Sequence, residues 1–295
     1  MKTGESREVD VIAQIGLAYE ILRWEEKALI EAAKEINLGV KLLHLHVACM
    51  SVGKRSTEEL GVDIILQRAI SHAIALNSTL ALESMGMRVL NSSITTAIAM
   101  NKLWTLKVLA QKGLPIPNTI ITFDFDPSLK AAQILGYPVV IKPIDGSWGR
   151  LIAMARDEEE LRALLEHRSY ISNPSIKVNM IQEFVKKPGR DLRIFVVGEE
   201  VVTAIYRVSN HWITNTARGG IALPAKIDQE VEELTLKAAK AVEGEILGVD
   251  VFEDPSRGYI VNEINAIPEF KNTVKVTGVP LHRKMMEYVK NLVKR

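Results

Sequence analysis

The first third of the chain alternates short apolar runs with longer amphipathic segments. The runs have the length of strands, and the segments between them carry apolar side chains at helical spacing. Parallel strands need crossover helices of this kind, so the alternation predicts a parallel α/β domain over residues 1–95. The expected strands are 9–17, 40–48, 62–67 and 87–90, and the expected helices are 24–36 and 71–85.

The rest of the chain mixes helices with strands that are close enough in sequence to pair as hairpins. Gly198 separates two such strands, and the turn 254–258 separates two more. We expect an α+β region with a central lobe at 96–184 and a C-terminal lobe at 185–295. Its expected strands are 139–142, 180–184, 191–197, 200–208, 246–252 and 259–264, and its expected helices are 98–112, 127–135, 157–167, 228–243 and 281–293.

The composition argues against several classes of protein. The 295 residues carry 37 Lys and Arg against 36 Asp and Glu, so the net charge of +1 provides no global field to attract nucleic acid. No apolar run approaches the roughly 18 residues of a membrane span, and Met1–Asp10 lacks the apolar core of a secretion signal. The single cysteine, Cys49, excludes a disulfide framework, and beside Met50 it is expected to be buried. We expect a cytoplasmic protein without a nucleic-acid or membrane partner.

Oxygen-bearing side chains gather on two neighbouring predicted strands near the C-terminus. Glu263 and Asn265 are two residues apart, so they point to one face, and Asp250 on the neighbouring strand can reach the same place. Carboxylate and amide oxygens suit Mg²⁺, whose shell water and phosphate oxygens would complete. The alternative is a set of polar residues on a half-solvated sheet.

Two lysines and a glycine-rich turn could meet an anion. Lys142 ends the apolar strand 139–141, where burying an unpaired ammonium would be costly, and Lys102 begins a helix. The turn Asp145–Arg150 could close backbone N–H groups over phosphates, although it matches neither a P-loop nor a dinucleotide-binding fingerprint. Lys102 could equally be a solvated helix residue, and the turn alone is a weak signal.

Two further segments carry groups suited to a nucleotide and to carboxylates. The strand Gln182–Lys186 could offer its backbone and Glu183 to adenine, and Asp191 could hold ribose hydroxyls. Arg207 precedes the loop Asn215–Gly220, which contains a second arginine, and guanidinium groups bind carboxylates and phosphates through paired hydrogen bonds. The alternatives are a plain connecting strand and a loop with solvated arginines.

The order of these elements is more informative than any one of them. Along the chain there follow a helix lysine, a strand lysine, a glycine-rich loop, a Gln-Glu strand, an Arg/Asn loop and then Asp…Glu-x-Asn. This order resembles that of the ATP-grasp superfamily over about residues 90–280. The chain is most similar to the RimK-like branch and, within it, to the LysX-type ligases of lysine biosynthesis. The resemblance implies a three-lobed ATP-grasp fold with the parallel α/β domain as its N-terminal (pre-ATP-grasp) domain. The segments that carry it are 23–27, 67–72, 139–151, 182–193, 211–220 and 262–273.

The resemblance also implies roles for individual residues. ATP phosphates would be held by Lys102, Lys142 and the loop of Asp145, Gly146, Ser147, Trp148, Gly149, Arg150 and Leu151. Adenine and ribose would be held by Gln182, Glu183, Phe184, Val185, Lys186 and Asp191. One or two Mg²⁺ ions would be bound by Asp250, Glu263 and Asn265. The catalytic groups would be Arg193, Arg218 and Asn215, with Arg193 and Asn215 beside the transferring phosphate. The amino-acid substrate would contact Arg207, Thr216, Ala217, Arg218, Gly219, Gly220, Glu269, Phe270, Lys271, Asn272 and Thr273.

Ligases of this type join the α-amino group of 2-aminoadipate to the C-terminal glutamate of the small acidic carrier protein LysW through an acyl phosphate. The sister glutamate ligases end the segment matching 269–273 in Gly-Phe, where this chain has Asn272-Thr273, and they tend to lack the arginine matching Arg218. A residue smaller than Phe at 273 would leave room for the extra methylene of aminoadipate. One methylene discriminates by only about 1–3 kcal/mol, so dual specificity remains open.

Four readings therefore remain, and all but the last are ligases. They are an aminoadipate ligase, a glutamate or dual-specificity ligase that also serves arginine biosynthesis, a RimK-like ligase that adds glutamate to a ribosomal protein, and a silent nucleotide-binding regulator. The resemblance also implies a homo-oligomer, either a dimer or a tetramer.

Overall fold

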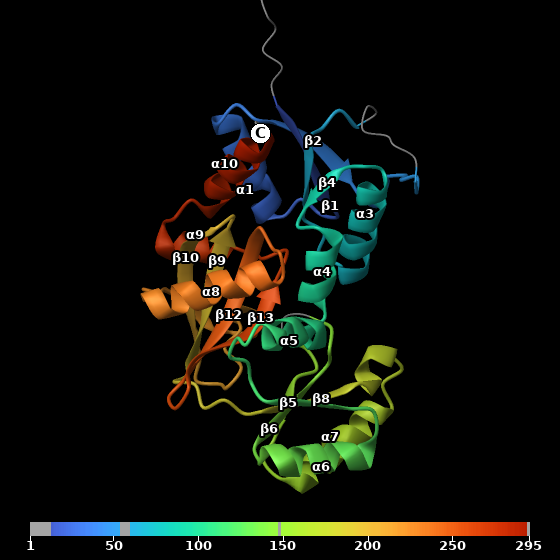
Figure 1. Ribbon diagram of the computed structural model, residues 1–295, viewed down its shortest axis with the longest axis vertical. Coiled ribbons are helices and arrows are strands. Elements are labelled where there is room, and N and C mark those ends of the chain that lie inside the picture. The colour runs from blue at the N-terminus through green and yellow to red at the C-terminus, as the bar shows by residue number, and fades with distance from the viewer. Residues whose placement is uncertain (1–12, 54–59, 147–148, 294–295) are drawn as a thin grey trace, which may run out of the picture. The chain divides into compact units, whose positions relative to one another are not determined.

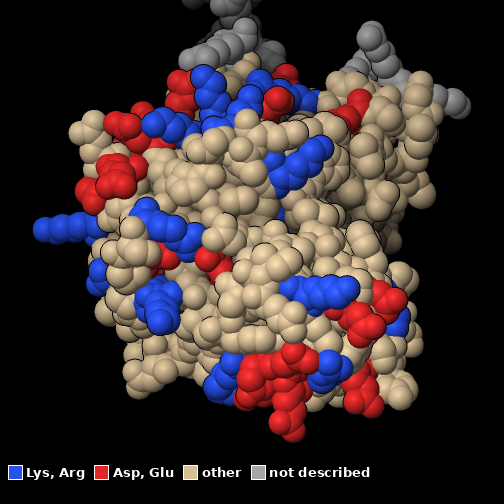
Figure 2. All heavy atoms as spheres, turned by 60° about the horizontal axis from the view of Figure 1, so that its bottom comes forward, with Lys and Arg blue, Asp and Glu red and all other residues tan. Residues whose placement is uncertain are grey.

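The structure is a computed structural model. The chain folds into two compact units (Figure 1). One unit runs to Leu90 and resumes at His282, and the other runs from Asn91 to Leu281. On the face shown in Figure 2, basic and acidic side chains are interspersed, in keeping with the net charge of +1. In the part that the structure describes, no helix is both long and apolar enough to cross a membrane. The described residues are 13–53, 60–146 and 149–293, so predictions that rest on Met1–Asp10, Ser147 or Trp148 lie outside them.

The first unit is built on a four-stranded parallel sheet, which confirms the predicted α/β class. Buried side chains such as Ile65 and Leu82 form its core. The strands are β1 (Gln14–Tyr19), β2 (Gly39–His44), β3 (Ile64–Gln67) and β4 (Arg88–Leu90), in the order β2-β1-β3-β4. The helices are α1 (Trp24–Glu35), α3 (His72–Ser84) and α10 (Leu281–Val293).

Helix α10 groups with the first unit from His282 onward, whereas the sequence analysis assigns it to the C-terminal lobe. Its side chains Met285, Met286 and Val289 are buried. The Lys290 ammonium donates to the carbonyl oxygen of Ile36, the C-cap of α1. Helix α10 therefore belongs, from His282 onward, to the compact unit built on β1 to β4.

The prediction that Cys49 is buried is wrong. Strand β2 ends at His44 and does not continue to residue 48. Cys49 therefore lies in the segment beyond the sheet, where it is exposed.

The second unit begins with two helices where the sequence predicts one over 98–112. Helix α4 (Ser93–Met100) and helix α5 (Lys102–Gln111) are separated by Asn101, whose backbone is extended. The Asn101 side chain accepts a hydrogen bond from the Trp104 N–H and so caps α5, as Asn commonly does. The Lys102 N–H donates to the carbonyl oxygen of Ile144 at 2.7 Å, which fixes the start of α5 beside the glycine-rich turn.

One antiparallel sheet of the second unit forms the central lobe. Helices α6 (Phe125–Leu135) and α7 (Glu158–Ser169) pack on it through a core that includes Leu129, Ile141 and Leu161. Its strands are β5 (Thr119–Thr122), β6 (Val139–Lys142), β7 (Ala153–Ala155) and β8 (Asn179–Glu183), in the order β5-β8-β6-β7. A 3₁₀ turn, η1 (Pro174–Lys177), precedes β8.

The other antiparallel sheet contains both predicted hairpins. Helix α8 (Gln229–Ala241) lies over it (Figure 1) and shares its core with α4 and α5 through residues such as Val231, Ile98 and Leu109. The turn η2 (Thr216–Arg218), strand β11 and helix α9 (Lys271–Thr277) are additional elements that the sequence analysis does not predict. The strands are β9 (Arg190–Val197), β10 (Glu200–Val208), β11 (Ile221–Pro224), β12 (Ile246–Asp254) and β13 (Gly258–Asn265), in the order β11-β10-β9-β12-β13.

Candidate functional site

The two sheets of the second unit line a cavity of about 800 Å³, a volume that includes open solvent at its mouth. Its apolar lining includes Val140, Pro143, Ile152, Phe184, Val185, Trp212, Ile213 and Phe252. Its polar lining includes Lys102, Lys142, Arg150, Gln182, Glu183, Lys187, Asp191, Arg207, Asn215, Asp250, Asn262 and Glu263.

Two carboxylates come together where β12 and β13 pair. Asp250 and Glu263 are directly opposite each other in the register, as the metal prediction requires. The register shifts just after Asp250, and this bulge brings Asn262 as well as Glu263 to the cavity. Asn265 does not line the cavity, and its amide donates to the Gly248 carbonyl oxygen at 3.4 Å. Asn262 therefore lines the cavity beside Glu263, and the role of Asn265 in binding Mg²⁺ stays a prediction.

Both carboxylate oxygens of Asp250 accept hydrogen bonds from guanidinium groups. Arg193 binds Asp250 through two nitrogens, and its Nη2 lies 3.0 Å from Oδ2. The Arg207 Nη2 also lies 3.0 Å from Oδ2. Burial lowers the pKa of Arg207, but Asp250 and Asp191 outweigh it and raise that pKa, so the group stays charged.

Two lysines stand beside the second carboxylate. The Lys102 Nζ lies 3.4 Å from the Glu263 carboxylate and donates to the Gly146 carbonyl oxygen at 2.6 Å. The Lys142 Nζ donates to the Asn262 Oδ1 at 3.2 Å. Burial lowers the pKa of Lys142 to about 8, with Glu263 opposing that shift. Burial raises the pKa of Glu263, but Lys102 and Lys142 outweigh it, so the carboxylate stays ionised.

The glycine-rich turn contributes its ends to the site. Gly146 and Gly149 have positive φ and line the cavity, as does Arg150. The Arg218 Nη2 donates to the Gly149 carbonyl oxygen at 2.6 Å. Asp145 accepts instead from the Ser175 hydroxyl at 2.7 Å, and the Leu151 side chain is half exposed; neither lines the cavity.

The strand predicted to hold adenine runs along the apolar part of the cavity. Gln182 to Val185 line it, Lys186 is exposed, and the next residue, Lys187, points to it instead. The Lys187 Nζ lies 4.8 Å above the centre of the Phe252 ring. The Glu183 carboxylate accepts from the backbone N–H and side chain of Asn118 and pairs with Arg257, so the protein already supplies its donors.

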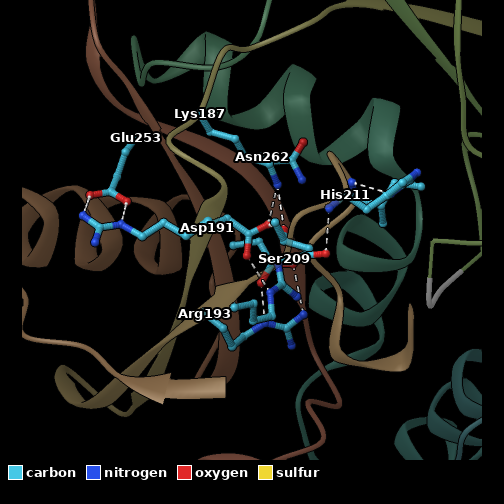
Figure 3. A network of polar contacts seen from close by, with 12 residues as sticks. Lys187, Asp191, Arg193, Ser209, His211, Glu253 and Asn262 are labelled. Atoms are coloured by element: carbon cyan, nitrogen blue, oxygen red, sulfur yellow. Dashed lines mark hydrogen bonds and ion pairs between the residues drawn. The ribbon is translucent and has the colours of Figure 1, made fainter. Parts of the chain in front are cut away.

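Asp191 is the centre of a buried network that sequence analysis did not predict (Figure 3). Its Oδ1 accepts from the Arg207 Nε at 2.7 Å. Its Oδ2 accepts from the Lys187 Nζ at 3.0 Å and from the Thr214 hydroxyl. Burial raises the pKa of Asp191, but Arg207 and Lys187 outweigh it and lower that pKa. Burial also lowers the pKa of Lys187, against the effect of Asp191.

The Asn215–Gly220 loop is a tight backbone turn, and its arginine, Arg218, is exposed to solvent. The N–H groups of Arg218 and Gly220 both donate to the Asn215 carbonyl oxygen, and Gly219 is left-handed. A Cβ on Gly220 would lie 2.1 Å from the Thr214 carbonyl oxygen, so only glycine fits there. Asn215 lines the cavity, Thr216 and Ala217 form the 3₁₀ turn with Arg218, and the Arg218 side chain is exposed.

The 269–273 segment lies at the start of α9 and does not line the cavity. Phe270 and Thr273 are buried, each 1% exposed. Glu269, Lys271 and Asn272 are exposed. Any contact of this segment with a substrate is therefore made from outside the cavity that the structure shows.

Comparison with known proteins shows the family of the chain. The model of the RimK-like ATP-grasp domain matches residues 99–289, and that of the LysX pre-ATP-grasp domain matches residues 15–98. The chain belongs to the RimK-like ATP-grasp family. It is therefore an ATP-dependent ligase with the predicted ATP-grasp fold.

Several relatives cover almost the whole chain. The alpha-aminoadipate–LysW ligase LysX of Sulfurisphaera tokodaii is 44% identical over 94% of this chain and 99% of its own. The glutamate–LysW ligase ArgX of Sulfolobus acidocaldarius is 34% identical over 94% of this chain and 98% of its own. The crystal structure of a RimK-domain ATP-grasp protein from Sphaerobacter thermophilus has a TM-score of 0.77 at 20% identity, covering 94% of this chain and 99% of the other, and shares its fold.

ATP-grasp enzymes use ATP and Mg²⁺, and the donor set of the cavity fits both. Its apolar part suits a base, and its lysines suit phosphates. In the described residues, no three His, Cys, Asp or Glu side chains are grouped to hold a metal. Asp250 and Glu263 would therefore depend on amide, water and phosphate oxygens to complete the shell that Mg²⁺ prefers.

Proposed function

We propose that this ligase joins the α-amino group of L-2-aminoadipate to the γ-carboxylate of the C-terminal glutamate of LysW, with release of ADP and phosphate. The observation that carries the proposal is the cavity, which combines two carboxylates, opposite each other in the strand register, with five basic side chains and an apolar lining. The identity of 44% to an aminoadipate–LysW ligase supports the choice of substrates.

The nucleotide would lie with its base against Phe184, Val185 and Phe252 and its phosphates toward the cations. Lys102 and Lys142 would bind phosphate oxygens beside the Gly146–Gly149 turn. Asp250, Glu263 and an amide from Asn262 or Asn265 would hold one or two Mg²⁺ ions, which when bound neutralise charge on the phosphates.

The reaction proceeds in two transfers. The carrier's γ-carboxylate attacks the γ-phosphorus of ATP, the bond to the β,γ-bridging oxygen breaks, and ADP and an acyl phosphate form. The neutral α-amine of aminoadipate then attacks the acyl carbon, phosphate leaves, and the amine loses a proton as the amide forms. Lys102, Lys142 and Arg193 stabilise charge on the transferring group. Exclusion of water by the site protects the acyl phosphate from hydrolysis.

Recognition of the amino acid would depend on groups outside the buried ion pairs. Arg218 is exposed on a rigid turn, so it can bind a substrate carboxylate with little reorganisation. Asn272 and Thr273 would set the length of the accepted diacid. Because Thr273 is buried, its effect on selectivity would come through the position of the start of α9.

The test is release of ADP by the purified chain. We expect sustained ADP release only when LysW and 2-aminoadipate are both present, because the second transfer consumes the acyl phosphate and frees the site for another cycle. ADP release that is indifferent to both compounds would contradict the proposal.

A glutamate–LysW ligase is the second candidate. It is favoured by the 34% identity to ArgX over nearly the whole chain. Replacing aminoadipate with glutamate in the same assay separates the two, and comparable kcat/KM for both amino acids would indicate dual specificity.

A further inference from the structure

The side chain of Asn91 joins the open ends of the two strands that carry the candidate metal carboxylates. We propose that Asn91 is a positioning residue, which fixes the register of β12 and β13 and thereby holds Asp250 opposite Glu263. It acts through the backbone of the strand pair. The inference rests on the proposed function only for the role of these two carboxylates in binding Mg²⁺.

Asn91 is 2% exposed, and its side-chain amide binds backbone groups from both strand ends. Its Nδ2 donates to the carbonyl oxygens of Ile246 at 2.7 Å and Ala266 at 2.8 Å. Its Oδ1 accepts from the N–H groups of Glu245 at 2.8 Å and Ile246 at 3.1 Å. Ile246 begins β12 and Ala266 follows directly after β13, so one planar amide ties the two strands together where the hairpin is open.

The hairpin turn fixes the register of β12 and β13 only as far as the bulge. On the turn side, the loop 254–258 sets the pairing up to Val251 opposite Val261. The register shifts there, because the bulge adds a residue to β13. The pairs beyond the bulge, which begin with Asp250 opposite Glu263, are therefore not fixed by the turn and need a second constraint.

Strand β13 is more dependent on such a constraint than β12. Strand β12 pairs with β9 along its other edge, whereas β13 lies at the edge of the sheet. One backbone contact of β13 outside the sheet, from the Val261 N–H to the Pro115 carbonyl oxygen, lies on the turn side of the bulge. The bond from Asn91 to Ala266 lies on the other side of the bulge, with the Glu263 carboxylate between them. Asn91 therefore constrains the part of β13 that carries the carboxylate.

Thr95, which lies close to Asn91 in the sequence, provides a matched comparison. It is completely buried, and its hydroxyl lies 3.0 Å from the carbonyl oxygen of Val242 and 2.9 Å from that of Glu243. Both carbonyl groups precede β12, so these bonds anchor one strand and do not join two. Losing them should destabilise the fold without changing the register of the strand pair.

The test is made in the full chain with Asn91→Asp, which keeps the accepting oxygen and replaces the donating amide by an oxygen that faces two carbonyl groups. Binding of Mn²⁺ in the presence of ADP, followed by electron paramagnetic resonance of free Mn²⁺, is expected to weaken by about tenfold. The affinity for metal-free ADP, measured by calorimetry, should be unchanged, because the proposed base contacts lie in the apolar lining. The amides of residues 262–266 should exchange their hydrogens faster than in the wild type.

Two controls accompany this variant. Thr95→Val should lower the melting temperature and leave the Mn²⁺ affinity and the exchange of residues 262–266 unchanged. Asp126→Asn, on the exposed side of α6, should change none of these quantities. Asn91→Ala, which buries no charge, repeats the comparison if Asn91→Asp does not fold.

The proposal is overturned if the Asn91 variant binds Mn²⁺ as the wild type does, or if Thr95→Val weakens that binding equally. It is also overturned if neither Asn91 variant folds, since Asn91 would then support the fold and not the site. Asp250→Asn separates this failure from that of the metal assignment. If Asp250→Asn binds Mn²⁺ as tightly as the wild type, the metal assignment fails, and the hydrogen exchange of residues 262–266 still decides whether Asn91 holds the strand pair.

Discussion

The β12–β13 strand pair and the Asn215–Gly220 loop differ in how their charged side chains are placed. Asp250 and Glu263 lie among Arg193, Arg207 and Lys102, and their charges are compensated inside the protein. The loop is held by backbone hydrogen bonds and presents the exposed Arg218. Under the proposed function, the phosphate and metal chemistry would therefore depend on a buried network, where losing one partner is costly. Substrate choice would depend on an exposed group that can change more freely.

The largest effect is expected at the strand pair. Asp250→Asn removes the negative charge that pairs with two guanidinium groups, and it alters a proposed ligand of Mg²⁺. ADP release should fall by about 1000-fold, while circular dichroism shows a folded chain. Asp126→Asn serves as the matched control. Retained turnover in Asp250→Asn would remove Asp250 from the metal site.

The loop should be sensitive to its backbone geometry. Gly220→Ala places a Cβ 2.1 Å from the Thr214 carbonyl oxygen, so the turn must shift. We expect kcat/KM for the amino acid to fall by about 100-fold, with the affinity for ADP retained. Gly39→Ala, whose new Cβ would meet mainly the Gln14 side chain, is the control. An equal loss of ADP affinity would show that the two regions are not separable in this way.

Selectivity should shift by less. Replacing Asn272-Thr273 with Gly-Phe is expected to move the preference toward glutamate by about tenfold, within the range that one methylene allows. Because Thr273 is 1% exposed, Phe must displace its neighbours, and the melting temperature should fall as well. The measurement compares kcat/KM for both amino acids. An unchanged ratio would mean that selectivity is set elsewhere.

The smallest effect concerns pH. Burial lowers the pKa of Lys142 to about 8, so the ammonium is charged below that pH and becomes neutral above it. The affinity for metal-free ADP should therefore fall several-fold as pH rises through about 8. Lys142→Met should bind ADP more weakly and lose most of this dependence. The same pH dependence in wild type and variant would assign it to another group.

The sequence predicts most of the fold because apolar periodicity is strong where elements are buried. The parallel strands, both hairpins and helix α8 follow from it. The pattern fails at Asn101, where a side-chain cap interrupts a continuous amphipathic stretch. It also fails at α9, because a helix of seven residues is too short to show a clear apolar periodicity. Cys49 is exposed because the strand before it ends early, and apolar composition alone does not reveal that end.

The candidate site is predictable in part for a similar reason. Four charged residues stand out because they lie within apolar elements or at their ends, and the structure brings all four to the cavity. They are Asp250, Glu263, Lys102 and Lys142. Asn262 could not be found from strict alternation, because a bulge turns it to the same side as Glu263. The Asp191 network depends on contacts between residues up to 57 positions apart, such as Arg193 with Asp250, and no local pattern shows these.

We propose that this ligase attaches 2-aminoadipate to the C-terminal glutamate of LysW. The most direct test is the mass of LysW after incubation with the chain, ATP, Mg²⁺ and an equal mixture of 2-aminoadipate and glutamate. We expect a carrier heavier by one aminoadipate less one water, with the change at its C-terminal glutamate. A carrier of unchanged mass, or one that gained mainly glutamate, would contradict it.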